Sequence, residues 1–217
     1  MSAAALDHLV VAAPTLDLGV QWCEAVLGIT PGAGGQHPLM GTYNRLFNIS
    51  SAAFAQAFFE IIAIDPGAPP PGRARWFGLD TLDLRGGPRL LHWVARSSAI
   101  EAQRRALREA GLDIGPAIAA SRDTPQGRLE WQLTVPDDGR LLAGGALPTL
   151  IDWGRTPHPT AAMPSSGVAL RALMLRGLTS AAIRALDARG VVHAADAGPA
   201  ITAMLDTPRG PVTLSSI

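Results

Sequence analysis

The sequence predicts an α+β protein built from three β-α-β-β-β units. Two observations lead to this prediction. First, an apolar strand followed by a capped helix and a glycine occurs three times. His8 and His92 hold equivalent positions in the first strands of two units. Gly28 lies 20 residues after His8, Gly111 lies 19 residues after His92, and the third unit repeats this spacing. Second, three short strand-like segments separated by turn residues come after each helix.

The first unit is expected to span residues 1–66. Its first strand is apolar and β-branched, and Thr15 is placed to cap a helix that ends at Gly28. A sheet of this kind needs a helix on one face, which this segment supplies. Its strands are expected at residues 6–12, 29–30, 43–49 and 58–64.

The second unit is expected at residues 88–156, after a linker rich in Pro and Gly at residues 67–87. Residues 98–101 form a capping-box pattern that opens its helix, and Gly111 ends it. Its strands are expected at residues 90–96, 117–120, 129–135 and 147–153.

The third unit is expected at residues 168–217, after a second linker at residues 157–167. Thr179 is placed to cap its helix. Its strands are expected at residues 168–175, 191–194, 200–205 and 211–214. A unit of this kind without a partner would expose a sheet edge or an apolar face, so we expect a homodimer.

Composition excludes several classes of function. The 217 residues carry 18 basic and 18 acidic side chains, and this net charge of zero argues against a nucleic-acid partner. Every basic residue is arginine, which excludes a phosphate-binding Walker lysine and a pyridoxal Schiff base. No apolar run approaches the ~20 residues of a membrane-spanning helix, so no membrane partner is expected. The N-terminus lacks the basic start of a signal peptide, so we expect a cytoplasmic protein.

Histidines occupy matching places in the first strands of the first two units. Alternation along a strand predicts that His8 shares a face with Leu6, and that His92 shares a face with Leu90. A lone histidine on an apolar strand is more often a hydrogen-bonded core residue than a ligand. The two histidines therefore indicate a metal site only if other residues that can bind a metal ion lie near them.

Two carboxylates are the further candidate metal ligands. Glu60 and Asp152 lie in the last strands of the same two units. If the units pair about a pseudo-twofold axis, these carboxylates converge with His8 and His92, and two imidazoles with two carboxylates suit a divalent cation such as Zn²⁺, Fe²⁺, Mn²⁺ or Ni²⁺. The third unit has Leu170 at the histidine position, so we interpret it as structural.

Three segments resemble a known family. Residues 6–11 (Leu-Asp-His-Leu-Val-Val), 58–62 (Phe-Phe-Glu-Ile-Ile) and 90–95 (Leu-Leu-His-Trp-Val-Ala) resemble the vicinal oxygen chelate superfamily, which contains glyoxalases, bleomycin-resistance proteins and extradiol dioxygenases. Residues 34–46 and 147–153 are similar to its glyoxalase-like domain branch. The resemblance covers about residues 5–160 well, and the last unit by pattern only.

This resemblance implies a pair of βαβββ modules that form a cupped mixed sheet with the helices outside, around a metal ion. In glyoxalase I the ligand positions correspond to His8, Glu60, His92 and Asp152. In the dioxygenases only two histidines and one carboxylate bind iron, and these correspond to His8, His92 and Asp152.

Further polar and aromatic residues are candidates for binding the substrate. They are His37, Thr42, Asn44 and Trp131. The alternatives are that Thr42 and Asn44 satisfy the backbone of a turn, and that Trp131 belongs to the core. His158 and His193 lie outside the symmetric set and are expected at the surface.

We therefore predict a metal-dependent lyase or isomerase that acts on a small molecule with two neighbouring oxygen atoms. The cation, held by His8 and His92, stabilises an enediolate, and Glu60 or Asp152 is the general base. One alternative is an Fe(II) extradiol-type dioxygenase, in which Glu60 would occupy a position that oxygen needs. The other is a metal-free protein that binds a drug or metabolite, as in the bleomycin-resistance relatives.

Overall fold

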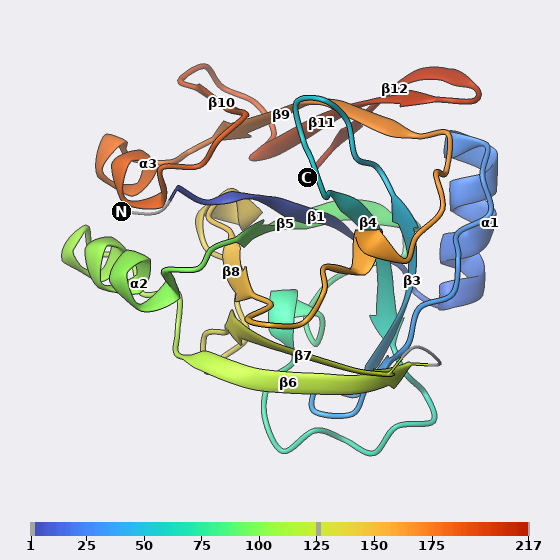
Figure 1. Cartoon of the computed structure of the whole chain (residues 1–217), viewed down its shortest axis with the longest axis horizontal. Coiled ribbons are helices and arrows are strands. Elements are labelled where there is room, and N and C mark those ends of the chain that lie inside the picture. The colour runs from blue at the N-terminus through green and yellow to red at the C-terminus, as the bar shows by residue number, and fades with distance from the viewer. Residues whose placement is uncertain (1–2, 125–126, 217) are drawn as a thin grey trace.

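Two sheets form the molecule (Figure 1). This computed structural model describes residues 3–124 and 127–216. The larger sheet has eight strands in the order β2-β3-β4-β1-β5-β8-β7-β6, and the smaller has four in the order β10-β9-β11-β12. The larger sheet curves until β2, at one of its edges, contacts β6 at the other. It therefore encloses a space, and the predicted α+β class with a cupped mixed sheet is confirmed.

The first module forms one half of the larger sheet. Its elements are β1 (Ala5–Ala12), α1 (Leu16–Leu27), β2 (Gln36–His37), β3 (Thr42–Asn48) and β4 (Phe58–Ile64). As predicted, the Thr15 hydroxyl accepts a hydrogen bond from Leu18 N, and Gly28 ends the helix with a left-handed φ of 74°. The second strand lies at residues 36–37 rather than 29–30.

The second module repeats this topology. Its elements are β5 (Arg89–Arg96), α2 (Ile100–Glu109), β6 (Ala117–Thr124), β7 (Gly127–Thr134) and β8 (Thr149–Asp152). In each module the first strand is parallel to the last, since β1 pairs with β4 and β5 with β8. β1 and β5 pair antiparallel at the centre of the sheet, which relates the modules by an approximate twofold axis.

The third unit has the predicted order of elements and a different strand pairing. Its elements are β9 (Ala169–Arg176), α3 (Ser180–Leu186), β10 (Val191–Ala194), β11 (Ile201–Thr207) and β12 (Gly210–Ser215). Here the first strand is parallel to the strand directly after the helix, β10, instead of the last strand. Leu170, Leu173 and Leu205 belong to the same core cluster as Leu6 and Leu9 of β1. The unit thus buries its apolar face within its own chain, while β10 and β12 remain sheet edges, and the homodimer stays a prediction.

Register shifts in the central strands change which side chains share a face. The pairing of β1 with β5 shifts between Leu6 and His8, and again between Val10 and Val11, where Leu91 is left over on β5. Leu6 consequently packs with Leu9 in the outer core, away from His8. The predictions that Leu6 lies with His8 and Leu90 with His92 are therefore wrong, because each strand has an extra residue at a bulge.

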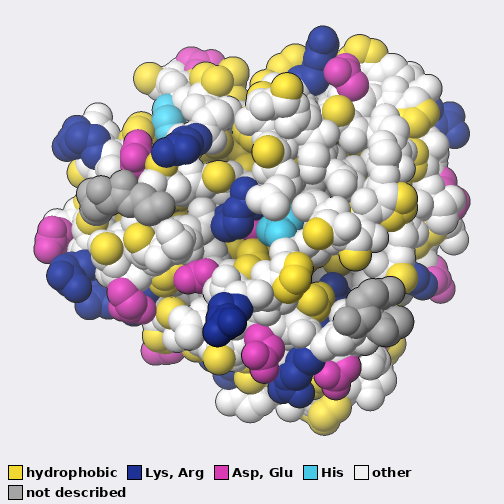
Figure 2. Space-filling model, in the orientation of Figure 1, with side chains coloured by type: hydrophobic (Ala, Val, Ile, Leu, Met, Phe, Trp, Pro, Cys, Tyr) yellow, Lys and Arg dark blue, Asp and Glu magenta, His cyan; other side chains and the backbone are white. Residues whose placement is uncertain are grey.

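The interior is divided by the larger sheet into two apolar clusters. The outer cluster lies between this sheet, the helices and the smaller sheet, and it includes Trp93 and Phe59. The inner cluster lines the concave face and includes Val10, Ile62 and Trp131. Basic and acidic side chains alternate over the face of the molecule that Figure 2 shows, without a patch of one sign. Within the described ranges, none of the helices has both the length and the apolar character needed to cross a membrane.

Candidate active site

A buried line of charged groups runs from β1 to β4. The imidazole Nδ1 of His8 donates to Asp7 Oδ1 at 2.7 Å, and its Nε2 lies 3.5 Å from Glu60 Oε2. The ring stacks on Phe58 with the centroids 4.4 Å apart. Burial alone would lower the pKa of His8, but its hydrogen bonds with the two carboxylates raise that pKa to about 9. His8 is therefore an imidazolium at neutral pH.

The partner carboxylates stay ionised. Burial raises the pKa of Glu60, but the hydrogen bond and charge of His8 outweigh it and bring the pKa to about 2. Burial acts in the same way on Asp7, and its hydrogen bonds with His158 and His8 hold its pKa well below the ordinary value. Two anions with one cation between them are a stable arrangement in a water-poor interior only when the remaining oxygens also have partners.

Asn44 supplies a partner to Glu60. Its Nδ2 donates to Glu60 Oε1 at 2.6 Å and to His37 Nε2 at 3.3 Å. The backbone N–H of Gly35 donates to Asn44 Oδ1 at 2.8 Å, which fixes the orientation of the amide because only its oxygen can accept. The Arg122 guanidinium donates to the same oxygen at 3.1 Å. Asn44 thus leaves Glu60 Oε2 as the oxygen that faces His8.

His37 is a neutral support for Asn44. Since its Nε2 accepts from Asn44, its Nδ1 carries the proton and donates to Thr42 Oγ1 at 3.0 Å. Burial lowers the pKa of His37 to about 4, and Glu60 opposes this shift only in part. The structure therefore brings the predicted residues His37, Thr42 and Asn44 together behind Glu60, where Asn44 contacts a carboxylate in addition to the backbone.

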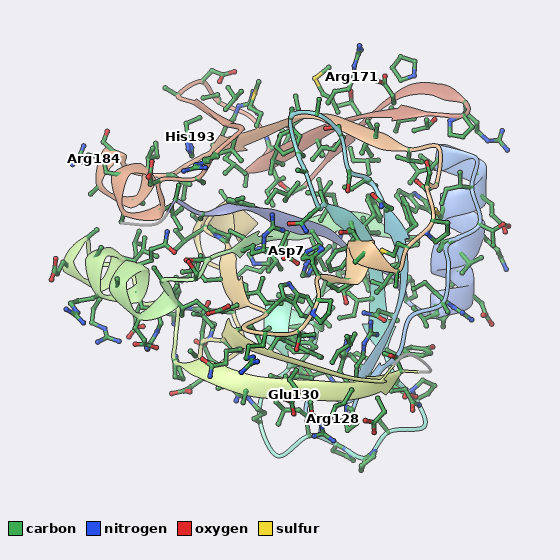
Figure 3. The ribbon with its side chains drawn as sticks, in the orientation of Figure 1. Asp7, Arg128, Glu130, Arg171, Arg184 and His193 are labelled. Atoms are coloured by element: carbon green, nitrogen blue, oxygen red, sulfur yellow. The ribbon has the colours of Figure 1, made fainter. Side chains whose placement is uncertain are left out.

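Asp7 also holds the segment that follows β8. Its Oδ2 accepts from Trp153 Nε1 at 2.9 Å and from His158 Nε2 at 3.1 Å, and Arg96 Nη1 lies 3.5 Å away. Figure 3 shows Asp7 near the centre of the molecule. The predicted surface position of His158 is wrong, because this side chain is buried against Asp7.

A small cavity of about 40 Å³ adjoins this line of charges. Its walls are apolar and aromatic, and they include Phe58, Trp76, Phe77, Trp131 and Trp153. Trp131, a predicted substrate-binding residue, thus lies at the cavity. The polar residues on the cavity wall are His8, His37, Asn44, Glu60 and Arg122. A pocket with apolar walls and a few converging polar groups is the usual form of a small-molecule site.

His92 is held by the backbone and lies outside this cavity. Its Nε2 accepts from Thr149 N at 3.0 Å, so its Nδ1 carries the proton and donates to Gly145 O at 3.0 Å. Burial lowers the pKa of His92 to about 3, which keeps the ring neutral. Both ring nitrogens are therefore engaged in hydrogen bonds with the backbone.

Asp152 lies at the outer end of β8. It is half-buried, and its Oδ1 accepts from Gly154 N at 2.8 Å. It lines a broad surface hollow together with Gln132, its partner on β7, and does not line the cavity.

The four residues predicted to bind one metal ion therefore do not lie together. His8 and Glu60 meet, whereas His92 and Asp152 lie elsewhere. Across residues 3–124 and 127–216, no three His, Cys, Asp or Glu side chains are arranged to hold a metal ion. The two histidines and one carboxylate of an iron site are separated in the same way. The residues present do not fit a resident metal ion.

Several residues that line the cavity or contact its charged groups were not predicted from the sequence. Asp7 was hidden by the bulge that turns it toward His8. Trp76 and Phe77 lie in a short 3-10 helix (Trp76–Gly78) within the segment predicted to be a linker. Arg122 lies on β6 beyond the predicted strand end at residue 120. The Trp-Phe pair inside a Pro-rich segment was the one available signal, since exposed linkers seldom contain two large aromatic residues.

Gly34 keeps this arrangement in place. A Cβ at this position would collide with the carbonyl oxygen and the side chain of Asn44. We expect Gly34→Ala to lower the free energy of unfolding by about 1–3 kcal/mol, measured by urea denaturation. Gly86→Ala is the control, because a Cβ there meets nothing within 4 Å and the change should be nearly neutral. Equal effects of the two changes would contradict the packing argument.

The free energy of unfolding is expected to be greatest near pH 6.5. His8 has a raised pKa, so its contribution is complete below pH 6.5 and is lost as the pH rises to about 9, by about 3 kcal/mol in total. His37 and His92 have lowered pKa values of about 4 and 3, so stability falls as the pH decreases from 6.5, with about 1.4 kcal/mol per pH unit from each.

Urea denaturation at pH 5, 6.5 and 8.5 measures this dependence. The residues facing His8 are Asp7, Glu60 and Phe58, and both carboxylates remain charged across this range. In His8→Gln the alkaline decrease should disappear. A stability that keeps rising from pH 6.5 to 8.5 in the unmodified protein would contradict the charge state assigned to His8.

The sequence and the fold are similar to those of known proteins. A family model described as "Glyoxalase-like domain" matches residues 6–189. A hypothetical protein from Staphylococcus aureus has a similar structure, with a TM-score of 0.58 and 16% identity over 98% of this chain and 86% of that chain.

Two methylmalonyl-CoA epimerases are more distant structural matches. The Streptomyces coelicolor enzyme has a TM-score of 0.46 and 15% identity over 73% of this chain and 100% of its own. The Mycobacterium tuberculosis enzyme has a TM-score of 0.41 and 21% identity over 72% and 91%. A search of curated proteins found no match.

Proposed function

This chain belongs to the glyoxalase-like domain family of the vicinal oxygen chelate superfamily, and from that premise we propose that it is a lyase or isomerase that moves a proton at a carbon beside a carbonyl group. The substrate is a small molecule with two neighbouring oxygen atoms. The observation that carries the proposal is the meeting of His8 Nε2 with Glu60 Oε2 at the wall of a buried, aromatic cavity.

The two groups have complementary roles in this reaction. Glu60 Oε2 removes the proton from the carbon, and the His8 imidazolium donates a hydrogen bond to the oxygen that becomes negatively charged. Glu60 then returns the proton to the same carbon or to its neighbour. Asp7 keeps His8 protonated, and Asn44 holds the other oxygen of Glu60.

Substrate binding also strengthens Glu60 as a base. In the free protein its low pKa of about 2 results from His8, while burial acts in the opposite direction. If a substrate oxygen accepts the hydrogen bond of His8 in place of Glu60, His8 lowers the pKa of Glu60 less than before, while Glu60 remains buried. The pKa of Glu60 then rises toward the range in which a carboxylate removes protons effectively.

The form of this chemistry that uses a divalent metal ion requires His92 and Asp152 as further ligands. Because the first is engaged by the backbone and the second lies at the outer surface, the proposal assigns the stabilisation of negative charge to His8. The dioxygenase alternative needs His8, His92 and Asp152 at one point, and their separation gives it no support.

Deuterium incorporation tests the proposal. The protein is incubated in D₂O, with and without EDTA, with dihydroxyacetone, pyruvate and the hemithioacetal of methylglyoxal, and the carbon-bound deuterium is measured by NMR. We expect incorporation into at least one compound, at a rate that EDTA does not change. Incorporation that EDTA abolishes would overturn the role given to His8.

A metal-free binding protein is the second candidate function. It is favoured by the aromatic walls and by the complete pairing of Glu60 with His8 and Asn44 in the free protein. Calorimetry with the same compounds distinguishes the two functions, because binding without any deuterium incorporation would support this candidate against the first.

A further inference from the structure

An arginine at the mouth of the cavity forms no salt bridge with a carboxylate of the described residues. Arg122 lines both the cavity and the broad surface hollow beside it, as do Trp131 and Trp153, so these residues mark the boundary between the two. The hydrogen bond that its guanidinium makes to a side chain goes to the neutral amide oxygen of Asn44. Among the described residues, no carboxylate forms a salt bridge with Arg122.

This arginine differs from its neighbour on the next strand. Arg128 is exposed and lies 3.3 Å from Glu130 and 3.9 Å from Asp123. Figure 3 labels Arg128 and Glu130. Arg122 is half-buried, and burial lowers the pKa of its guanidinium, although the charge of nearby Glu60 acts in the opposite direction. A partly desolvated guanidinium has lost hydration that a carboxylate can replace with two parallel hydrogen bonds.

Trp76, on the wall of the cavity, has a donor group with no acceptor among the described residues. The indole Nε1 of Trp76 is buried without a hydrogen-bond acceptor, and the residue is 4% exposed. A buried indole N–H normally has an acceptor, so its absence indicates a place for a ligand oxygen. Together with His8 Nε2 and Arg122, the cavity has three donor groups, and its one carboxylate, Glu60, is already paired with His8 and Asn44.

We propose that the substrate is a small carboxylate, whose carboxylate group binds Arg122 at the mouth while its neighbouring oxygen accepts hydrogen bonds from Trp76 Nε1 and His8 Nε2. The inference rests on the proposed function in one respect, which is that the reacting carbon lies next to Glu60. Gly35 makes the anion site accessible, because a Cβ there would lie 2.6 Å from Arg122 Nη1.

Matched acid and amide pairs test this substrate class. Binding of pyruvate and pyruvamide, and of lactate and lactamide, is measured by isothermal titration calorimetry. We expect each acid to bind at least about tenfold more tightly than its amide, because the amide lacks the charge that Arg122 recognises. Equal affinities within both pairs, or no binding of either acid, would overturn the proposal.

Three variants assign the effect to particular residues. Arg122→Gln should reduce the acid-to-amide ratio to below about threefold, whereas Arg128→Gln, in the same hollow, should leave it unchanged. Trp76→Phe keeps a ring and removes the N–H, so it should weaken acid and amide by a similar factor of about fivefold. A ratio that falls equally in Arg122→Gln and Arg128→Gln would show a general effect of charge and overturn the proposal. Thermal unfolding of each variant verifies that it is folded.

The results also separate this inference from the proposed function. Tight binding of acids that depends on Arg122, without deuterium incorporation, supports the carboxylate site and contradicts catalysis. Deuterium incorporation into neutral compounds that is unchanged in Arg122→Gln supports catalysis and contradicts the carboxylate site.

Discussion

Glu60→Gln is expected to lower the rate of deuterium incorporation by about 10²–10⁴-fold while the protein remains folded. Gln has nearly the same shape as Glu, and its amide oxygen can still accept from Asn44 Nδ2, which now donates to Glu60 Oε1 at 2.6 Å. The change removes the group that takes the proton. It also removes one of the two carboxylates that raise the pKa of His8.

Binding and rate together test this role. Because the amide cannot act as a base, substrate affinity measured by calorimetry should change much less than the rate of incorporation. Glu130→Gln is the matched control, since Glu130 is an exposed residue of β7 outside the cavity and its rate should equal that of the unmodified protein. A Glu60→Gln protein that is folded and exchanges at the original rate would exclude Glu60 as the base.

The overall fold was accessible from the sequence because it depends on local signals that repeat. The Thr15 cap and the Gly28 stop act within a single helix, and the modules resemble each other closely enough to be aligned by spacing. The strand pairing of the third unit was not accessible. The same order of elements can place the first strand beside either the strand after the helix or the last strand, and only packing against the larger sheet decides between them.

The candidate site was predicted in part for a related reason. His8 and Glu60 lie on adjacent parallel strands of one module, with His8 paired to Phe58, so alternation within that module brings them together. The prediction that His92 and Asp152 join them required the second module to repeat the first in detail. There the N–H of Thr149 and the carbonyl of Gly145 occupy both nitrogens of the imidazole, and no periodic pattern reveals backbone contacts of this kind.

Asp7 was missed because a bulge is invisible to a rule of strict alternation. The rule places Asp7 on the outer face, opposite His8, where a carboxylate among leucines would be costly. That cost was itself a signal. A buried acidic residue next to a histidine on an apolar strand indicates either a break in alternation or a close partner, and here both are present.

Asp7→Asn is expected to lower the free energy of unfolding by about 3–5 kcal/mol at pH 6.5, measured by urea denaturation. The fully buried carboxylate accepts from His8, Trp153 and His158, and an amide cannot accept from all three without turning its own N–H groups toward another donor. Asp206→Asn is the control, because Asp206 pairs with Arg171 at the surface and its loss should cost less than about 1 kcal/mol.

A second substitution removes only one of the contacts that Asp7 makes. His158→Gln removes the imidazole that contacts Asp7 Oδ2 and keeps the other partners of Asp7, so it should cost less than Asp7→Asn and leave the alkaline decrease in stability in place. In Asp7→Asn that decrease should become smaller, because Asp7 contributes to the raised pKa of His8. If Asp7→Asn left both the stability and its alkaline decrease unchanged, His8 would owe its charge to Glu60 alone. Asp7 would then neither stabilise the fold nor connect the segment after β8 to the charge of His8.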